Sequence, residues 1–341
     1  MRAALSLAFI VAGVAHAADP SLVEKSKSLF KPLSKQFESK DNPVTREKVA
    51  LGRQLFFEKR LSKNHDVSCN SCHALSKYGV DGEPTSQGHK KQRGDRNSPT
   101  VFNAGAHFAQ FWDGRAKDLE EQAKGPVLNP VEMAMADAAA VEKVLKSIPG
   151  YAPMFKAAFP NDKEPITYDN MAKAIGAFER TLAVPSRFDA FLGGDEKALS
   201  DAEKKGLETF LATGCTACHM GEGVGGAMYQ KLGLVKPVPG LKDEGRAKIS
   251  KSEADKYFFK APSLRNIEKT APYLHDGSKK TLEETVAFMG EYQLGKQLKK
   301  DEVDSIVTFL KALTGELPKG DALTEPKPLP GGKDTPKPDP T

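Results

Sequence analysis

Residues 69–73 read Cys-Asn-Ser-Cys-His and residues 215–219 read Cys-Thr-Ala-Cys-His, and together they contain all 4 cysteines of the chain. In this CxxCH pattern, two thiols each form a thioether with one vinyl group of a single haem, and the adjacent histidine becomes an axial ligand of the iron. The pattern therefore predicts two covalently bound c-type haems, held by Cys69, Cys72 and His73 and by Cys215, Cys218 and His219.

A CxxC pair also occurs in zinc half-sites, redox dithiols and disulfides. A zinc site requires both pairs to converge on one metal, which leaves the histidine after each pair without a function. With 7 histidines in 341 residues, finding one at both positions by chance is rare. The repeated pentapeptide therefore favours haem attachment over these alternatives.

The composition suits two globular domains, since 341 residues with 39% hydrophobic content form two ordinary cores. The formal net charge is only +5. Loss of Arg2 with a signal segment and addition of about four haem propionates bring this charge close to zero. Because the sequence contains no nucleic-acid-binding motif, we expect no nucleic-acid partner.

Residues 1–17 have the layout of a secretory signal peptide. Arg2 precedes an apolar run over residues 3–14, and Ala-His-Ala at residues 15–17 forms a small-residue cleavage site. The run is shorter than the ~20 apolar residues that cross a membrane, so we expect no membrane span. Because bacteria attach c-type haem outside the cytoplasm, we expect the mature chain in the periplasm.

A Gly-x-x-x-Phe helix is predicted before each CxxCH motif. Gly52 and Phe56 share one face of the helical pattern in residues 44–60, and Gly206 and Phe210 do the same before the second motif. Glycine on such a face permits a close helix crossing. This internal repeat predicts an all-α fold with two cytochrome c-like helical haem domains and long loops.

The predicted domains are residues 18–185 and 186–317, with a boundary stretch at 185–200. The tail, residues 318–341, is rich in Pro, Lys and Gly and has no apolar period, so we expect it to be disordered or to wrap the surface in extended form. Further helices are predicted over residues 137–147, 167–183 and 301–314, and capping boxes at Ser200 and Thr281 each begin a helix.

Four further residues are of chemical interest, although each also has an ordinary structural interpretation. His89 stands in the glycine-rich loop 78–99, where a histidine is most often a solvated side chain. Trp112 is the only tryptophan, which more often fills a core, and Glu132 follows Asn-Pro, where a glutamate is more often on the surface. Met289 lies on a predicted helix 70 residues after His219 and is a candidate sixth haem ligand.

The chain closely resembles the bacterial dihaem cytochrome c peroxidases from about residue 43 to residue 313. Besides CNSCH and CTACH, the resemblance is carried by GHK and RNSPT in residues 88–100, FWDGR at 111–115, Gln122 with NPVEM at 129–133, TAPYLHDG at 270–277 and FMGEYQLGK at 288–296.

The resemblance implies a role for each of these residues. His73 and His219 are then the proximal iron ligands, His89 is a removable distal ligand of the first haem, and Met289 is the distal ligand of the second. Trp112 is expected between the haems, and Gln122 and Glu132 in the peroxide pocket. Asn97 and the backbone oxygens of Thr270 and Pro272 resemble an interdomain Ca²⁺ site.

The implied function is reduction of hydrogen peroxide to water in the periplasm. Thioether ligation raises the potential of the second, C-terminal haem, so that this haem feeds the first, peroxidatic one. Peroxide needs an open iron, so His89 must leave, and Glu132 is expected to shuttle the proton. A small cytochrome c or a copper protein is the expected electron donor, and the family implies a homodimer.

Three alternatives stay open. One is a dihaem enzyme that oxidises a protein tryptophan, in which tyrosine replaces the distal methionine; Met289 argues against it, although Tyr292 lies nearby. Another is a dihaem electron-transfer cytochrome, which lacks a proton-shuttling carboxylate, so Glu132 and the His89 loop weigh against it. The third is a purely structural or metal-sensing protein.

Overall fold

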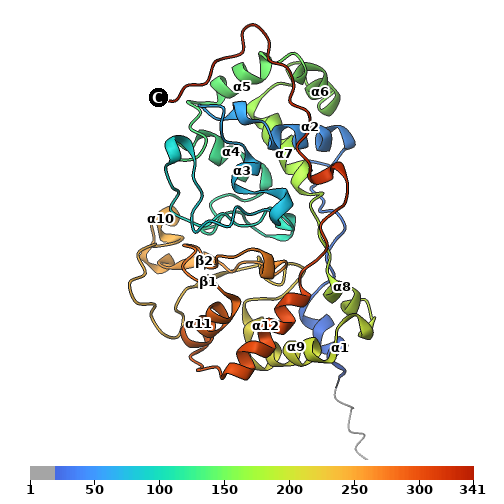
Figure 1. Cartoon of the computed structure of the whole chain (residues 1–341), viewed down its shortest axis with the longest axis vertical. Helices are drawn as coiled ribbons and strands as arrows, with labels where there is room; N and C mark the ends of the chain where they lie inside the picture. Colours follow the sequence, from blue (N-terminus) through green and yellow to red (C-terminus); the bar gives the residue numbers. More distant parts are fainter. Residues whose placement is uncertain (1–19) are drawn as a thin grey trace, which may run out of the picture.

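A computed structural model describes residues 20–341, so the predicted signal segment lies outside the described residues. The described chain is mostly helical with long irregular connections (Figure 1). Within residues 20–341, no helix is both long enough and apolar enough to cross a membrane.

The first group of helices surrounds a hydrophobic cluster built from residues between Leu51 and Val184. These elements form the upper part of Figure 1. The helices of this group are α2 (Arg46–Phe56), α3 (Cys69–Cys72), α4 (Leu119–Leu128), α5 (Ala138–Lys146), α6 (Tyr151–Ala158) and α7 (Tyr168–Glu179).

The second group surrounds a cluster that contains Phe188, Phe210 and Phe309. Phe309 contacts both other rings, with centroid distances of 5.3 Å to Phe188 and 5.4 Å to Phe210. The helices of this group are α1 (Leu22–Leu29), α8 (Arg187–Leu192), α9 (Asp201–Thr213), α11 (Leu282–Leu294) and α12 (Lys300–Ala312). Helices α8, α9, α11 and α12 form the lower part of Figure 1. The short helix α10 (Ala247–Ser250) contributes no residue to this cluster.

The glycines predicted to allow close helix crossings do so in both groups. A Cβ atom added to Gly52 of α2 would lie 1.9 Å from the carbonyl oxygen of Ala174 in α7. One added to Gly206 of α9 would lie 2.2 Å from the carbonyl oxygen of Ser305 in α12. The helix that precedes each CxxCH motif is therefore held against its partner at backbone contact.

A small sheet corrects the expectation of a purely helical chain. Strand β1 (Tyr229–Lys231) pairs antiparallel with β2 (Phe258–Lys260), with Tyr229 opposite Lys260. Single turns of 3₁₀ helix occur in the connections, at Lys59–Leu61, Leu75–Lys77, His89–Lys91, Ala104–Ala106, Glu196–Ala198, Cys215–Ala217, Glu253–Asp255, Ile267–Lys269 and Asp321–Leu323. The chain is thus mostly helical with one two-stranded sheet.

Each end of the described chain packs against the group of helices that is farther from it in the sequence. Phe30, which follows α1, packs on Phe188 of the second cluster with ring centroids 5.3 Å apart. At the other end, the tail runs in extended form over the first group, where Leu323 and Leu329 pack against its cluster (Figure 1). The domain bounds stay a prediction. That prediction did not include the crossing of either chain end to the other group of helices.

Candidate active site

The first CxxCH motif opens into a cavity of about 530 Å³. Cys69, Cys72 and His73 all line it, and α4 and α7 form other parts of its wall. The two thiols are not joined in a disulfide. The cavity therefore brings two free thiols and an imidazole to one space, which is the donor set that a c-type haem requires.

His73 is held in the form that binds a metal. Burial lowers the pKa of His73, although the Pro99 carbonyl partly offsets this effect, so the ring is neutral near pH 7. Its Nδ1 donates a hydrogen bond to the carbonyl oxygen of Pro99 at 2.9 Å. The lone pair of the ring is consequently on Nε2, the atom available to an iron.

Gln122 and Glu132, which the resemblance implies in the peroxide pocket, also line the first cavity. Gln122 projects from α4, and Glu132 follows the turn in which its backbone N–H donates to the Asn129 carbonyl oxygen at 3.0 Å. Burial raises the pKa of Glu132, and the charge of Arg115 and a hydrogen bond with Asn129 offset only part of this rise. Glu132 is therefore a carboxyl group suited to holding a proton inside the cavity.

His89 is buried but is not among the residues that line this cavity. Its backbone N–H donates to the Glu132 carbonyl oxygen at 2.7 Å, and a Cβ on Gly88 would come within 2.2 Å of the Val131 carbonyl oxygen. Both ring nitrogens of His89 are buried without a hydrogen-bond partner in the described chain. The loop thus docks His89 beside the Glu132 segment, and its role as an iron ligand stays a prediction.

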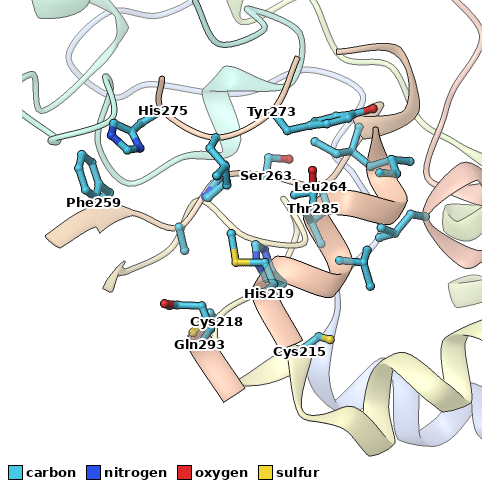
Figure 2. A pocket seen from close by; sticks show the side chains of 18 of the residues that line it. Cys215, Cys218, His219, Phe259, Ser263, Leu264, Tyr273, His275, Thr285 and Gln293 are labelled. Carbon is cyan, nitrogen blue, oxygen red and sulfur yellow. The ribbon is translucent and has the colours of Figure 1, made fainter. Parts of the chain in front are cut away.

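Cys215, Cys218 and His219 of the second CxxCH motif line another cavity, of about 210 Å³ (Figure 2). Met289 from α11 also belongs to its wall. Burial lowers the pKa of His219 to about 4, so this imidazole is neutral as well. Cys215 and Cys218 are free thiols. The histidine and methionine predicted as ligands of the second haem are therefore brought to the same cavity.

Trp112 lines both cavities. Its Nε1 donates to the Asn97 carbonyl oxygen at 2.9 Å, and its own carbonyl oxygen accepts a hydrogen bond from the Lys260 backbone N–H at 2.7 Å. These two bonds fix the residue from opposite parts of the chain. Its place between two haems stays a prediction.

Asn97, Thr270 and Pro272, the residues predicted for Ca²⁺, all line the second cavity. The Asn97 side-chain amide donates to the Glu83 carbonyl oxygen at 3.0 Å, and within the described part of the chain no hydrogen bond ends on its Oδ1. Among the hydrogen bonds of residues 20–341, none ends on the Thr270 or Pro272 carbonyl oxygen. Such neutral oxygens are ligands that Ca²⁺ accepts, and the site stays a prediction.

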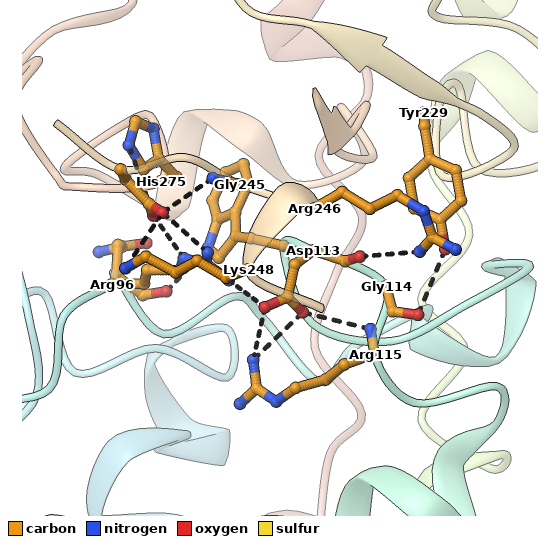
Figure 3. Close-up of polar contacts among 12 residues, drawn as sticks. Arg96, Asp113, Gly114, Arg115, Tyr229, Gly245, Arg246, Lys248 and His275 are labelled. Atoms are coloured by element: carbon orange, nitrogen blue, oxygen red, sulfur yellow. Dashed lines mark hydrogen bonds and ion pairs between the residues drawn. The ribbon is translucent and has the colours of Figure 1, made fainter. Parts of the chain in front are cut away.

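A network of ion pairs connects the two groups of helices and was not predicted (Figure 3). Arg96 pairs with Asp113 at 2.5 Å and with Asp243 at 2.6 Å, and Arg115 reaches Asp113 at 3.2 Å. Burial opposes ionisation of Asp243, but hydrogen bonds from Arg96 and the Gly245 amide outweigh it and hold the pKa of Asp243 well below its ordinary range. The partners are up to 147 residues apart, so no local motif indicates the network.

Three more residues of the cavity walls were missed. Glu179 of α7 lines the first cavity, and Lys260 of β2 and His107 line the second. A single acid or base inside an apolar pattern carries no sequence signal of its own. Only the fold places these groups beside the motifs.

Comparison with known proteins gives a consistent result. A family model described as di-haem cytochrome c peroxidase matches residues 46–197. The cytochrome c551 peroxidase of Pseudomonas aeruginosa is 48% identical over 321 residues, covering 91% of this chain and 92% of that protein. The methylamine utilization protein MauG of Methylorubrum extorquens is 40% identical over 248 residues, covering 72% of this chain and 69% of that protein.

Among solved structures, a MauG-like protein associated with microbial copper homeostasis matches with a TM-score of 0.74 and 31% identity, covering 87% of this chain and 96% of that one. Sequence similarity thus extends well beyond the two haem motifs, and the cavities around those motifs contain the residue types that the resemblance implied. This chain belongs to the bacterial dihaem cytochrome c peroxidase family of oxidoreductases.

Proposed function

We propose that the protein reduces hydrogen peroxide to water at the first cavity. The observation that carries this proposal is that Gln122 and Glu132 line the cavity that contains the first CxxCH motif. Haem, when bound there, supplies an iron that accepts peroxide and delivers electrons to it. An electron-transfer cytochrome has no need of a carboxyl group in this place.

Glu132 carries the proton in this proposal. Hydrogen peroxide takes up two electrons and two protons and gives two water molecules. The oxygen that is bound must lose its proton, and the oxygen that leaves must gain one. Because burial raises the pKa of Glu132, its carboxyl group both accepts the first proton and returns it within the cavity. The Gln122 amide orients the peroxide.

The two motifs would hold the haems covalently, with His73 and His219 as the proximal ligands. Met289 is the distal ligand that we propose in the second cavity, and His89 is the distal ligand that leaves the first. The unpartnered ring nitrogens of His89 support this, because a buried imidazole without hydrogen bonds is costly unless it has another function. Trp112, in the wall of both cavities, would lie on the path of the electrons.

The proposed domains follow from these assignments. Residues 18–185 would form the peroxidatic domain and residues 186–317 the electron-transfer domain, with Ca²⁺ held by Asn97, Thr270 and Pro272 at their interface. We place the mature protein in the periplasm as a homodimer, with a small cytochrome c or a copper protein as the electron donor. The predicted signal peptide supports the location, since c-type haem is attached outside the cytoplasm.

Oxidation of a protein tryptophan is the other activity to consider, since MauG proteins are among the relatives. In that enzyme class a tyrosine replaces the distal methionine. Here Met289 lines the second cavity, and Tyr292 is not among its lining residues. The methionine favours the peroxidase.

The test is the substitution Glu132→Gln in the holoprotein. We expect peroxide turnover to fall by about 10²- to 10⁴-fold, the usual contribution of a positioned acid–base group. Haem content and both haem spectra should not change. Glu121→Gln is the matched control, because Glu121 is exposed and its hydrogen bond from the Lys117 N–H survives as a bond to the amide oxygen. Unchanged turnover in Glu132→Gln would exclude this residue as the proton carrier.

A further inference from the structure

Lys260 is a buried cation in the wall of the second cavity. Only 5% of the residue is exposed, and its position in β2 is fixed by the hydrogen bond from its N–H to the Trp112 carbonyl oxygen. A buried ammonium group is costly unless an anion compensates its charge. The acid that compensates Lys260 should therefore be close.

No carboxylate of the described chain has this function. Burial alone lowers the pKa of Lys260 to about 8, without a counteracting acidic group in residues 20–341. Asp113 and Asp243, the acidic groups of the ion-pair network, are already paired with arginines. At neutral pH the ammonium group is therefore mostly charged and unpaired in the cavity wall.

His107 does not compensate the charge. Its Nδ1 lies 3.4 Å from the Lys260 Nζ, so the ring offers at most one neutral acceptor. Burial, with the charge of Lys260 as a smaller cause, lowers the pKa of His107 well below its ordinary value. The imidazole is thus uncharged, and its Nε2 is buried without a partner in the described chain.

The missing anion has an obvious source if a haem fills this cavity. Haem carries two propionate carboxylates, and the cavity that contains His219 and Met289 also contains Lys260. We propose that Lys260 forms an ion pair with a propionate of the haem in the second cavity. This inference rests on the proposed attachment of that haem at Cys215 and Cys218.

The ion pair has a consequence for electron storage. A positive charge close to a haem favours the reduced state, which carries one positive charge fewer than the oxidised state. Loss of the Lys260 charge also leaves the propionate uncompensated, and this negative charge further disfavours the reduced state. Lys260 therefore raises the midpoint potential of the second haem and adds to the effect of the methionine ligand.

The experiment is a spectroelectrochemical titration of the holoprotein with Lys260→Met, Lys260→Arg and the control Lys231→Met. Lys231 is exposed on the adjacent strand β1 and does not line the cavity. For Lys260→Met we expect at least a tenfold loss in the equilibrium constant for reduction of the second haem, which corresponds to about 59 mV for one electron. The first haem, Lys260→Arg and Lys231→Met should keep their wild-type potentials.

Two results of this titration would overturn the proposed ion pair. The first is a wild-type potential in Lys260→Met with two haems bound, which would mean that Lys260 only supports His107. The second is a wild-type protein whose potential follows the phosphate concentration, which would indicate a free anion instead of the propionate. If Lys260→Met does not fold, Lys260→Gln, which keeps a donor for His107, must show the same loss. Fewer than two haems in the wild-type protein would contradict the proposed function itself.

Discussion

At the scale of single residues, the two glutamates that line the first cavity differ in their surroundings. Glu132 has Arg115 and Asn129 as partners that offset part of the effect of burial. Glu179 is only 3% exposed, and burial, together with the charge of Glu120, raises its pKa to about 8 despite the opposing charge of Arg180. Glu179 is therefore protonated in the folded protein at neutral pH.

This protonation makes stability depend on pH. Between about pH 4.5, the ordinary pKa of a glutamate, and about pH 8, the folded protein holds a proton on Glu179 that the unfolded chain has released. Stability from this group is therefore complete below pH 4.5 and decreases as the pH rises toward 8. Glu179→Gln removes this dependence. From pH 5 to pH 8 the unfolding free energy of the variant should therefore rise by a few kcal/mol relative to that of the wild type.

Guanidinium unfolding of both holoproteins at pH 5 and pH 8 measures this difference. Glu47→Gln, at an exposed position of α2, serves as the control and should follow the wild type at both values. Parallel behaviour of Glu179→Gln and the wild type would show that Glu179 is already ionised in the folded protein.

At the residue scale, sequence reasoning placed several residues at the two cavities, and their chemical roles stay predictions. Motif spacing and family resemblance identified His73, His219, Met289, Gln122 and Glu132, and all of them line one of the two cavities. The distinctive groups that it missed, Lys260 and Glu179, lie in a short strand and in an apolar helix face. Their burial depends on packing between distant segments, which no local pattern encodes.

At the scale of elements, two close helix pairs support the haem motifs. In each pair a glycine lies where a side chain would collide with the backbone of the partner helix, Gly52 against Ala174 and Gly206 against Ser305. Backbone atoms cannot move aside as a flexible side chain does, so the helices must separate if the glycine gains a Cβ. The close crossing thus depends on one residue in each pair.

Gly206→Ala should destabilise the protein by ~1–3 kcal/mol or more, the usual cost of overpacking. The added Cβ would lie 2.2 Å from the Ser305 carbonyl oxygen and 2.9 Å from the Phe309 Cβ. Gly125→Ala in α4 is the control, because the nearest atom to its added Cβ is the Phe111 Cζ at 3.4 Å. Alanine there should be neutral or stabilising, since glycine costs about 0.5–1 kcal/mol inside a helix.

Chemical denaturation of both variants makes the comparison. Equal midpoints for Gly206→Ala and the wild type would contradict the close crossing of α9 and α12.

The predicted elements were most accurate where a cap and an apolar period coincide. The capping boxes at Ser200 and Thr281 begin α9 and α11, and Asp137 caps α5, as expected. Helix α4 was not predicted, because it contains Gly125 and Pro126, which disfavour helix. Burial of its apolar side chains stabilises it instead. The three-residue strands β1 and β2 are too short to give a period and depend on pairing with each other.

At the scale of the whole molecule, both ends of the described chain cross to the other group of helices. The tail crosses to the first group, where the Arg53 Nη2 donates to the Thr324 carbonyl oxygen at 2.5 Å and the Asp339 N–H donates to the Lys63 carbonyl oxygen at 3.0 Å. The sequence is compatible with an extended tail, but the composition of the tail does not indicate which helices it packs against. The two leucines that anchor it are too few to form a period.

Deletion of residues 318–341 should loosen the first group of helices specifically. Loss of Leu323 and Leu329 from the cluster exposes apolar surface, which we expect to cost ~1–3 kcal/mol of unfolding free energy. Hydrogen exchange followed by mass spectrometry should show faster exchange in α2 and α5 and no change in α9 and α12. Unchanged protection in α2 would show that the tail only lies on the surface.

The most direct test of the peroxidase proposal is a pair of spectra of the calcium-loaded holoprotein, fully oxidised and half-reduced, with peroxide turnover measured in both states. We expect two haems per chain, and half-reduction should convert the low-spin first haem to a high-spin form in the electron paramagnetic resonance spectrum as turnover begins. That result supports the release of His89 and catalysis at the cavity lined by Glu132. Two haems that stay low-spin, with peroxide unconsumed in either state, would contradict the proposed function and identify an electron carrier.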